Sequence, residues 1–495
     1  MKNFFADLGR GIKSVFKGPA SKDNLFALDS RAPIADAIPF GLQHILAMFT
    51  SNIMPFIIVF TAIGLLNTEL AVHAMLGAIF MAGIGTILQL LIGARLPVVI
   101  GTSFTFLPVF LTIGTSVAAQ SDPATAYYTI MGSIIVGAVF AIVFSLFYKW
   151  WGKLIKPIVP AIVVLGVGLS LLTSGANSFL GGTDVISNII LTGQTGTPVP
   201  YFCYIIVALV TLIVALLWSI FMKGVWKNLN IVVGIVVGYI VSCCFPGMID
   251  FSNMAVNSFV GSHGVIDYPH VINLTKVRFE LVPCILTCIC FMATIVEAMG
   301  NIETTAKVGL GRKATAREIN GGLLTYGVNS GIAALFGAFP LTIYAQNVGI
   351  VSQTKVTNRF TIFIGAAFLV IASFFPPVAH FLFTIPDVVI GGTMVILFGS
   401  IAVIGMKSIS EVGWTDKNIL IVAISVCLGF GLTIATVTIG SDTMMSLSLF
   451  KALGVSWLGD LLSNNVLNMF IIAFILSWAL PEDMHISLFH KKEQQ

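Results

Sequence analysis

The chain has 495 residues, of which 57% are hydrophobic and only 9% are charged, and its formal net charge is +4. Soluble domains carry about 25% charged residues. This composition, with a mean hydropathy of +1.00, therefore excludes a water-soluble protein and indicates an integral membrane protein. A net charge this small gives no reason to expect a nucleic-acid partner.

Residues 1–38 precede the first apolar run and contain no hydrophobic region of the kind found in a signal peptide. Their first part, MKNFFADLGRGIKSVFKG, is basic and amphipathic. Such a stretch can lie on the inner face of the membrane, and a solvated tail is the alternative interpretation. In either case we expect residues 1–38 to form a cytoplasmic tail.

Fourteen apolar runs follow, and most of them approach the 20 or so residues that cross a bilayer. They cover residues 39–66, 70–92, 97–117, 126–148, 155–175, 201–222, 229–246, 281–306, 318–337, 340–355, 359–383, 387–406, 418–437 and 463–481. All seven cysteines lie inside these runs. The stretch CILTCIC has no His or acidic residue at ligand spacing, so we expect its cysteines to pack rather than to hold a metal.

The connections between the runs indicate how the chain is threaded. If the N-terminus is cytoplasmic, Lys and Arg gather in the connections that are then internal, whereas the long connection 174–200 has none. The internal basic residues are Arg95, Lys149, Lys153, Lys156, Lys223, Lys227, Lys307, Arg312, Lys313, Arg317, Lys355, Arg359, Lys407 and Lys417. This pattern follows the positive-inside rule and predicts a multi-pass protein of the cell membrane with both termini cytoplasmic. Lys276 and Arg278, in an external loop at 247–280, are exceptions.

Fourteen spans divide into two halves of seven, and an odd number per half makes the second half run upside down relative to the first. The third run is interrupted by Pro97, Gly101 and Pro108, and the tenth, third in the second half, by Pro340 and Gly349. Pro and Gly are common in membrane helices, but breaks at matching places in two halves mark the midplane site of a secondary transporter. The sequence therefore predicts an all-α membrane fold of 14 spans in two inverted 7-span repeats, with short extended segments in spans 3 and 10.

Glu297 lies more than a dozen residues into an apolar run, where an ionised carboxylate costs about 3 kcal/mol on insertion scales. Lys and Arg occur only at the ends of the runs and not in their interiors, where they could pair with it, so we expect Glu297 to serve a function. Asn301, four residues on, shares a helix face with it. His44 lies beside Gln43 in the first run and belongs either to the site or to the structural framework.

The stretch YAQNVGIVSQT, residues 344–354, places polar side chains between two apolar runs. The amides of Gln346 and Asn347 both donate and accept hydrogen bonds, and at the start of a half-helix they lie beside free backbone N–H groups. Such a site suits a small planar ligand with alternating N–H and C=O groups. Glu297 would offer it a strong acceptor and Phe104 an aromatic face, which together describe a nucleobase pocket.

The same residues resemble the signature of a known family. Gln346-Asn347-Val348-Gly349, followed by Thr354-Lys355, is similar to the pattern [Q/E/P]-N-x-G-x-x-x-x-T-[R/K/G] of the nucleobase–ascorbate transporters, also called nucleobase:cation symporter-2. Three further motifs match in order and spacing, namely Gln43-His44, Gly101-Thr102-Ser103-Phe104 and Glu297-Ala-Met-Gly. The resemblance covers residues 35 to 485 and is strongest to the xanthine and uric acid permease-like branch.

This resemblance implies a domain organisation. A core domain would comprise 39–148 (spans 1–4) and 281–385 (spans 8–11), and a gate domain 149–246 (spans 5–7) and 386–481 (spans 12–14). A cytoplasmic tail would follow at 482–495. The family further implies a homodimer, and transport of the substrate by an elevator-like movement of the core domain.

The resemblance also implies roles for particular residues. Glu297 and Gln346 would hold the substrate, the segment around Phe104, Thr105 and Gly349 would help, and Asn347 would orient the site. Thr354 closes the signature and is expected beside it. Gln at the first signature position is similar to the branch that transports xanthine, uric acid or guanine, whereas Glu there would indicate uracil and Pro ascorbate. No catalytic residue, metal or cofactor is expected.

Two positions depart from the pattern of the purine transporters. Asn301 and Tyr326 stand where those proteins usually have aspartates that are associated with proton coupling. Glu297 or His44 could carry the proton instead. We expect a proton rather than sodium as the coupling ion, and sodium coupling or no coupling stays as the alternative.

Other classes of membrane protein explain the sequence less well. An inorganic-anion exchanger of the same fold would be expected to lack an acid such as Glu297, because the carboxylate repels an anion. A channel more often repeats a small subunit around a pore. A membrane enzyme is disfavoured because the sequence has no HExxH, GxSxG or GxxxxGK motif. A uracil or other nucleobase permease is the nearest alternative.

Overall fold

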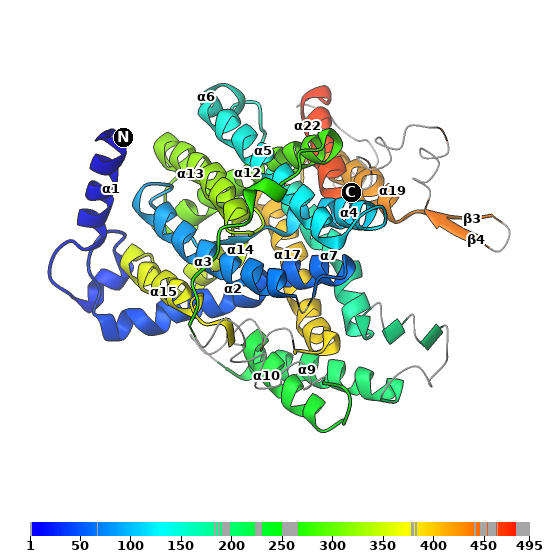
Figure 1. Ribbon diagram of the computed structural model, residues 1–495. Coiled ribbons are helices and arrows are strands. Elements are labelled where there is room, and N and C mark those ends of the chain that lie inside the picture. Colours follow the sequence, from blue (N-terminus) through cyan, green and yellow to red (C-terminus); the bar gives the residue numbers. More distant parts are fainter. Residues whose placement is uncertain are drawn as a thin grey trace, which may run out of the picture. The chain divides into compact units, whose positions relative to one another are not determined.

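The computed structural model describes the chain apart from several connections and the C-terminal tail. The described residues are 2–66, 68–182, 185–186, 189–190, 199–222, 230–249, 266–377, 381, 384–439, 442–445, 453, 462 and 464–481. They are almost entirely helical (Figure 1). They fall into two compact units, one formed by 1–146 with 172–399 and the other by 147–171 with 400–495, and each unit is described by itself.

Eight helical segments of the described chain are long and apolar enough to cross a membrane. They are α2 (Ile34–Ala62), α3 (Glu69–Leu91), α5 (Pro123–Leu146), α7 (Ile158–Phe179), α9 (Tyr201–Phe221), α12 (Leu281–Leu310), α17 (Asp387–Val412) and the segment Asp416–Ile434. The last is built from α18 (Asp416–Ile424), a π-helical turn η7 (Ser425–Phe430) and α19 (Gly431–Ile434).

Further helices complete the set, and all of them except the 20-residue α13 are shorter than 18 residues. They are α4 (Leu107–Ala118), α10 (Asn230–Cys243), α13 (Ala316–Leu335), α14 (Ala345–Thr354), α15 (Arg359–Ala372) and α22 (Asn465–Ala479), with α6 (Tyr148–Trp151) between α5 and α7. Each of the fourteen apolar runs therefore contains a helix. Helix α19 gives way to a hairpin of β3 (Thr436–Ile439) and β4 (Asp442–Met445), so the predicted run 418–437 ends in a strand. The number of fourteen spans and their inverted repeat stay predictions.

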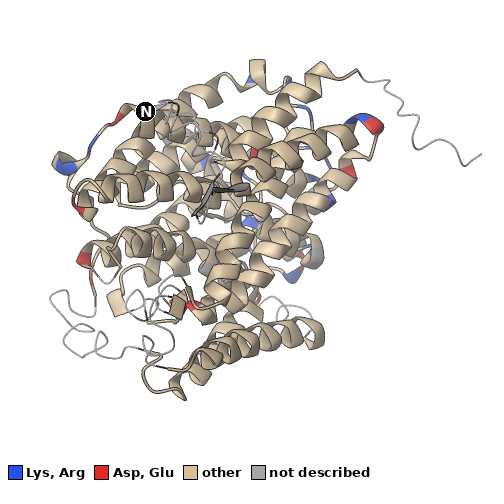
Figure 2. Ribbon diagram, turned by 90° about the vertical axis from the view of Figure 1, so that its right-hand side faces the viewer, with Lys and Arg blue, Asp and Glu red and all other residues tan. Residues whose placement is uncertain are grey.

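Charged residues lie mainly where helices begin and end. In Figure 2 the helices themselves consist almost entirely of uncharged residues. At the start of α13, Arg312 contacts both carboxylate oxygens of Glu318 at 2.6 and 2.8 Å, and Glu318 forms a capping box with Thr315. Such caps satisfy backbone N–H groups that a helix leaves free at its first turn. Polar contacts thus fix the start of α13. Between their ends the helices consist mainly of uncharged residues (Figure 2).

The N-terminal stretch forms a helix that packs against the protein, and its position at the cytoplasmic face of the membrane stays a prediction. Residues Lys2–Val15 form helix α1, and this helix packs on the end of α3 (Figure 1). Gly11 lies so close to the backbone of Leu91 that an added Cβ would meet the Leu91 carbonyl oxygen at 2.2 Å. Val15 is fully buried in a small apolar cluster with Leu91 and Phe360. The amphipathic pattern therefore serves packing against the protein itself, which a local pattern cannot distinguish from packing against lipid.

The two predicted breaks contain short extended segments that pair with one another. Strand β1 (Ile100–Thr102) runs antiparallel to β2 (Leu341–Ile343), with Gly101 opposite Thr342. The pairing continues on both sides, because the Ser103 N–H donates to the Pro340 carbonyl at 2.8 Å and the Tyr344 N–H to the Val99 carbonyl at 3.0 Å. Backbone groups inside a membrane must find partners within the protein, and here each extended segment supplies them to the other.

Each strand leads into a helical segment. A short 3₁₀ turn, η2 (Phe104–Phe106), follows β1 and continues into α4, while α14 follows β2. Asn52, on α2, anchors β1 because its Oδ1 accepts from the Thr102 N–H at 2.9 Å and from the Thr102 hydroxyl at 3.0 Å. The Tyr344 hydroxyl donates to the Thr102 carbonyl at 2.8 Å. The starts of two helical segments are thereby brought to one place.

Candidate functional site

Glu297 lies beside the segment that follows β1. Its side chain extends from the middle of α12 and is only 8% exposed. Its carboxylate Oε2 accepts a hydrogen bond of 3.1 Å from the Thr105 hydroxyl. Among the described residues this is its one hydrogen-bond partner, and none of their Lys or Arg side chains pairs with it. An acceptor with capacity for several hydrogen bonds is therefore left with most of that capacity unused.

The start of α14 forms another part of this region. The Asn347 side-chain amide donates to the backbone carbonyl of His44 at 3.3 Å, which joins α14 to α2. Gln346 is half-buried, and a Cβ added to Gly349 would meet no atom within 4 Å. Open space therefore lies beside Gly349, close to the half-buried amide of Gln346.

Several buried polar atoms near this junction have no hydrogen-bond partner within the described chain. They are the Asn347 Oδ1, the His44 Nδ1, both amide atoms of Gln43 and the Ser103 hydroxyl. Native proteins leave few buried polar groups unsatisfied, and such groups are usually completed by water, an ion or a ligand. Their concentration where α2, β1 and α14 meet is the feature of this region that most resembles a binding site.

Phe104, the predicted stacking residue, is buried at the start of η2. Its ring makes an edge-to-face contact with Phe398 of α17, with centroids 5.4 Å apart. Thr105, the next residue, is also buried and holds Glu297. The structure thus brings Phe104, Thr105 and Glu297 into one neighbourhood.

The two positions that depart from the family pattern make neutral hydrogen bonds. The Asn301 amide donates to the Ile343 carbonyl of β2 at 2.8 Å, and the Tyr326 hydroxyl lies 2.5 Å from that of Thr294. Asn301 thus ties α12 to β2, while Tyr326 ties α13 to α12. Both residues act here as structural connections around the site.

Thr354, the last predicted site residue, has a local role. Its hydroxyl donates to the Ile350 carbonyl of its own helix at 2.9 Å and accepts from the Val356 N–H at 3.2 Å. It lies at the C-terminal end of α14, two turns from Gln346. The signature Thr therefore closes the helix, and the structure does not bring its side chain to Glu297.

Sequence reasoning missed Asn52 and Tyr344, which fix the Thr102 backbone. A single amide inside an apolar run, as Asn52 is, was the signal that could have found one of them. Tyr344 was quoted within the polar stretch, but its partner lies 242 residues away. Local sequence gives no indication of such a partner.

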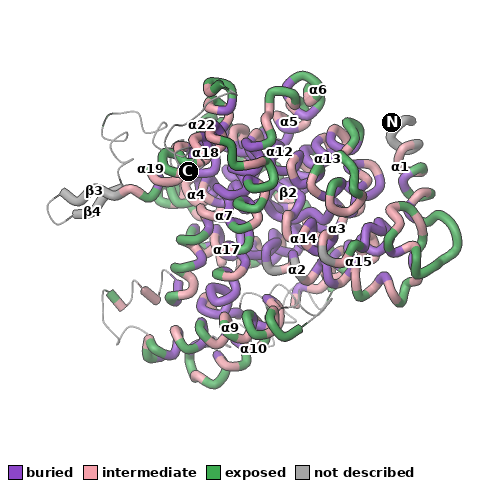
Figure 3. The backbone as a smooth tube through the Cα atoms, turned by 180° about the vertical axis from the view of Figure 1, so that it is seen from behind, coloured by how far each residue is buried: buried purple, intermediate pink, exposed green. Residues whose placement is uncertain are grey.

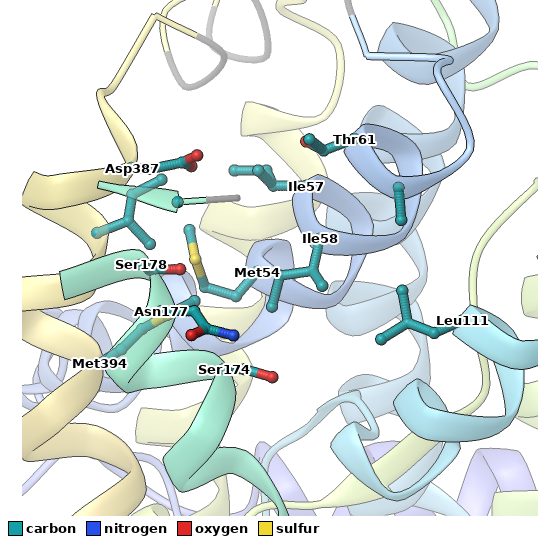
Figure 4. A pocket seen from close by; sticks show the side chains of 13 residues that line it. Met54, Ile57, Ile58, Thr61, Leu111, Ser174, Asn177, Ser178, Asp387 and Met394 are labelled. Carbon is teal, nitrogen blue, oxygen red and sulfur yellow. The ribbon is translucent and has the colours of Figure 1, made fainter. Parts of the chain in front are cut away.

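A cavity of about 460 Å³ lies between α2, α4, α7 and α17. Figure 4 shows apolar side chains of α2 and α4, such as Met54 and Leu111, across from polar side chains of α7. The polar lining residues are Thr61, Ser174, Asn177, Ser178 and Asp387. The volume is in the range of small-molecule sites, about 300–1,000 Å³.

The cavity contains none of the predicted site residues, so its position and the sequence motifs disagree. We give more weight to the motif residues as the binding site, because the buried unsatisfied polar atoms lie among them. The two regions are adjacent along α17. Met394 lines the cavity, and Phe398, one helical turn further, contacts Phe104.

The apolar helices indicate a multi-pass membrane protein, and the comparisons with known proteins place it among membrane transporters. A sequence profile described as a permease family matches residues 35–440. The chain belongs to this family, the nucleobase–ascorbate transporters, which confirms the resemblance carried by the motifs.

Individual relatives cover most of the chain. The xanthine permease XanQ of Escherichia coli (strain K12) is 31% identical over 423 residues, which are 84% of this chain and 87% of that protein. The xanthine permease of Bacillus subtilis (strain 168) is 30% identical over 410 residues, 80% of this chain and 85% of that protein.

Solved structures show the same fold at low sequence identity. The transmembrane domain of a cyanobacterial bicarbonate transporter, BicA, has a TM-score of 0.53 at 16% identity, with 77% of this chain and 95% of that chain covered. The murine solute carrier 26 family member A9 anion transporter, in its inward-facing state, has a TM-score of 0.59 at 12% identity, with 89% and 72% covered. These likenesses concern the fold alone.

Proposed function

We propose that the protein is a secondary transporter that imports a purine nucleobase, xanthine or uric acid, across the cell membrane. The observation that carries this proposal is the buried Glu297 carboxylate, which the described chain supplies with one hydrogen bond and no cation. A ligand with several N–H groups along one edge would use the remaining acceptor capacity. The names of the relatives, which are xanthine permeases, support the same ligand class.

In this proposal Glu297 accepts N–H groups of the purine ring. The Gln346 amide offers both a donor and an acceptor, and it forms hydrogen bonds with another edge of the purine ring. The space beside Gly349 leaves room for the plane of the base, and Phe104 contributes apolar surface. Asn347 keeps the start of α14 fixed against the His44 carbonyl. Binding is thus shared by α12, α14 and the segment after β1.

We propose that a proton drives transport and that Glu297 or His44 carries it. Asn301 and Tyr326 are unsuited to this task, since an amide does not titrate and the Tyr326 hydroxyl is engaged by Thr294. Movement is proposed to be of the elevator type, with core and gate domains as assigned from the sequence, both termini cytoplasmic, and two chains per transporter. Sodium coupling and uncoupled transport are the alternatives, and the experiment below separates proton coupling from both.

An inorganic-anion carrier is the second candidate function, because the solved structures of similar fold are anion transporters. Glu297 argues against it, since an ionised carboxylate repels an anion and no cation of the described chain offsets that charge. A purine transporter should take up purines, whereas an inorganic-anion carrier should take up an anion such as bicarbonate.

The test is uptake of labelled xanthine into proteoliposomes, with and without an inward proton gradient at fixed sodium. We expect gradient-dependent accumulation in the wild type. Glu297→Ala and Gln346→Ala should lower uptake by at least about tenfold, because hydrogen bonds to charged groups contribute roughly 1.5–3 kcal/mol. Glu303→Ala is the matched control, since Glu303 is an exposed acid on the same helix.

The outcomes separate the alternatives. Normal uptake by folded Glu297→Ala protein would refute the pocket. Xanthine uptake that is indifferent to the gradient keeps the pocket and removes the proton coupling. Failure of xanthine, uric acid, guanine and uracil uptake together with uptake of labelled bicarbonate would establish the anion carrier instead.

A further inference from the structure

A cluster of metal-binding side chains lies away from the proposed substrate site. His73 is in the second turn of α3, while Asp267 and His270 are in the extended stretch 266–273 that leads towards α12. The Nδ1 atoms of the two histidines are 2.9 Å apart, and a carboxylate oxygen of Asp267 is 3.8 Å from the His270 Nδ1. One ligand atom from each of the three residues lies within 4.8 Å of the other two.

The stretch that carries two of these ligands is held in place by its own backbone. The Asp267 N–H donates to the Phe374 carbonyl at 3.0 Å, and the Ile272 N–H donates to the Leu335 carbonyl at 2.8 Å. The ring of Tyr268 lies against that of His270, with centroids 4.5 Å apart. These contacts fix the stretch on both sides of His270, so the ligand atoms are positioned without any contribution from a bound ion.

The two facing nitrogens must share either a proton or a cation. A neutral imidazole has one N–H and one lone pair, so at 2.9 Å the two rings form a hydrogen bond when one Nδ1 carries its proton, and a cation can take the place of that proton. Glu69 lies on the other side of His73, with its carboxylate 3.6 Å from Nε2. A carboxylate there favours the proton on Nε2 and leaves the Nδ1 lone pair directed at His270. This is the arrangement of a carboxylate, a histidine and a metal that occurs in many zinc sites.

The donor set and its dimensions suit zinc. Imidazole nitrogen and carboxylate oxygen are both zinc ligands, and sites with three protein ligands keep a fourth position open. Tetrahedral coordination at a Zn–N distance of about 2.1 Å requires an N···N separation of about 3.4 Å. The two Nδ1 atoms would therefore have to separate by about half an ångström, and the Asp267 carboxylate oxygen, 3.8 Å from the His270 Nδ1, would have to approach by about as much.

We propose that His73, Asp267 and His270 form a zinc-binding site that joins the stretch 266–273 to the start of α3. The ion replaces the direct contact between the two histidines, and water takes the fourth position. Bound zinc then cross-links two segments that are nearly 200 residues apart in sequence. Since the folded chain holds the three ligands together and an unfolded chain does not, zinc stabilises the folded protein.

The experiment uses the full chain in detergent, purified without a polyhistidine tag, freed of metal with EDTA and then titrated with ZnCl₂. Bound zinc is counted by mass spectrometry after removal of free metal, and unfolding temperature is followed in parallel. We expect one tightly held ion per chain and, at a hundredfold excess of free zinc over its dissociation constant, an unfolding temperature higher by roughly 5 °C. His73→Gln and His270→Gln should lose both effects, whereas His490→Gln, the control, should keep them.

A second measurement needs no variant. Cobalt(II) loaded in place of zinc should give the intense visible absorption of a tetrahedral site with nitrogen and oxygen ligands, and zinc should displace it. Zinc bound equally by wild type and both histidine variants would overturn the proposal, and so would a wild-type cobalt spectrum typical of six-coordinate, solvent-exposed ions. No binding at micromolar zinc would show that a shared proton alone joins the two histidines.

Discussion

The segments that follow the two paired strands differ in how much of their surroundings is occupied. After β1, residues Phe104–Phe106 are all buried, and Thr105 is engaged by Glu297. After β2, Gln346 is only half-buried and open space lies beside Gly349. Two breaks that both contain Pro and Gly therefore differ in the folded protein: the segment after β1 forms a closed wall of the site, and the segment after β2 forms an open wall. A site of this kind can hold its acid rigidly and still leave room for a ligand.

The difference is clearest at the two motif glycines. A Cβ at Gly101 would meet the Tyr344 ring at 2.7 Å, the Met48 methyl at 2.8 Å and the Asn52 Oδ1 at 2.9 Å, whereas a Cβ at Gly349 would meet nothing within 4 Å. The first glycine is required by packing. The second is compatible with a larger residue in the folded protein, so a requirement for it would have to come from the ligand.

The largest effect is therefore expected from a pair of alanine substitutions. Gly101→Ala should destabilise the protein by about 1–3 kcal/mol, the usual cost of overpacking a core, and should reduce the yield of folded protein. Gly349→Ala should fold normally and lose xanthine uptake, because its methyl group occupies the ligand space. Thermal unfolding and uptake are measured on both variants. An equal loss of stability in Gly101→Ala and Gly349→Ala would show that the two segments are packed equally tightly.

A smaller effect is expected at the open wall itself. Gln346→Glu replaces an amide that donates and accepts by a carboxylate that only accepts, so the range of competing ligands should shift away from purines. A relative change of about tenfold between xanthine and uracil, equal to about 1.4 kcal/mol, is the expected size. Competition assays against labelled substrate measure it. An unchanged ranking of competitors would show that Gln346 does not discriminate between bases.

The smallest effect concerns two amides that hold the open wall, one before it at β2 and one at the start of α14. Asn301→Ala removes a 2.8 Å bond to β2 and should lower stability by about 1 kcal/mol, whereas Asn347→Ala removes a longer bond of 3.3 Å and should lower it less. Asn347→Ala should nevertheless reduce uptake, because it frees the start of α14. Unfolding curves and uptake curves measured on both variants separate the effect on stability from the effect on transport. A greater loss of stability in Asn347→Ala would show that the longer bond to the His44 carbonyl, and not the bond to β2, is the main support of this wall.

Much of the helical framework was predictable, because apolar length alone marks helices in a lipid environment. Helix α9 illustrates why the hydropathy of a run says little about how the helix packs. It has a higher mean hydropathy than α3, yet only 28% of its most apolar window is buried, against 78% in α3 (Figure 3). In lipid an exposed Phe221 costs nothing, so hydropathy identifies the element but not its neighbours. The packing of α1 on α3 was missed for the same reason.

The site was predictable as a set of residues but not as a network. Glu297 stood out because a lone acid in an apolar run requires an explanation, and the polar stretch at 344–354 stood out in the same way. The pairing of β1 with β2, the bond from Thr105 to Glu297 and the anchoring of Thr102 by Asn52 all join residues distant in sequence. No local propensity encodes such contacts. The His73, Asp267 and His270 cluster was missed likewise, because its ligands lack the close spacing that usually reveals a metal site.

The short ladder between β1 and β2 also has a consequence for the synthesis of the protein. Ile100–Thr102 leave the ribosome about 240 residues before their partners Leu341–Ile343. Until then their backbone groups inside the membrane lack the pairing that the folded protein gives them, at a cost of several kcal/mol for each group left unsatisfied in lipid. The first half of the chain therefore stays incompletely folded in the membrane until the second half has been synthesised. A chain that stops before residue 341 should be recognised as defective by membrane proteases, even though its first helices are intact.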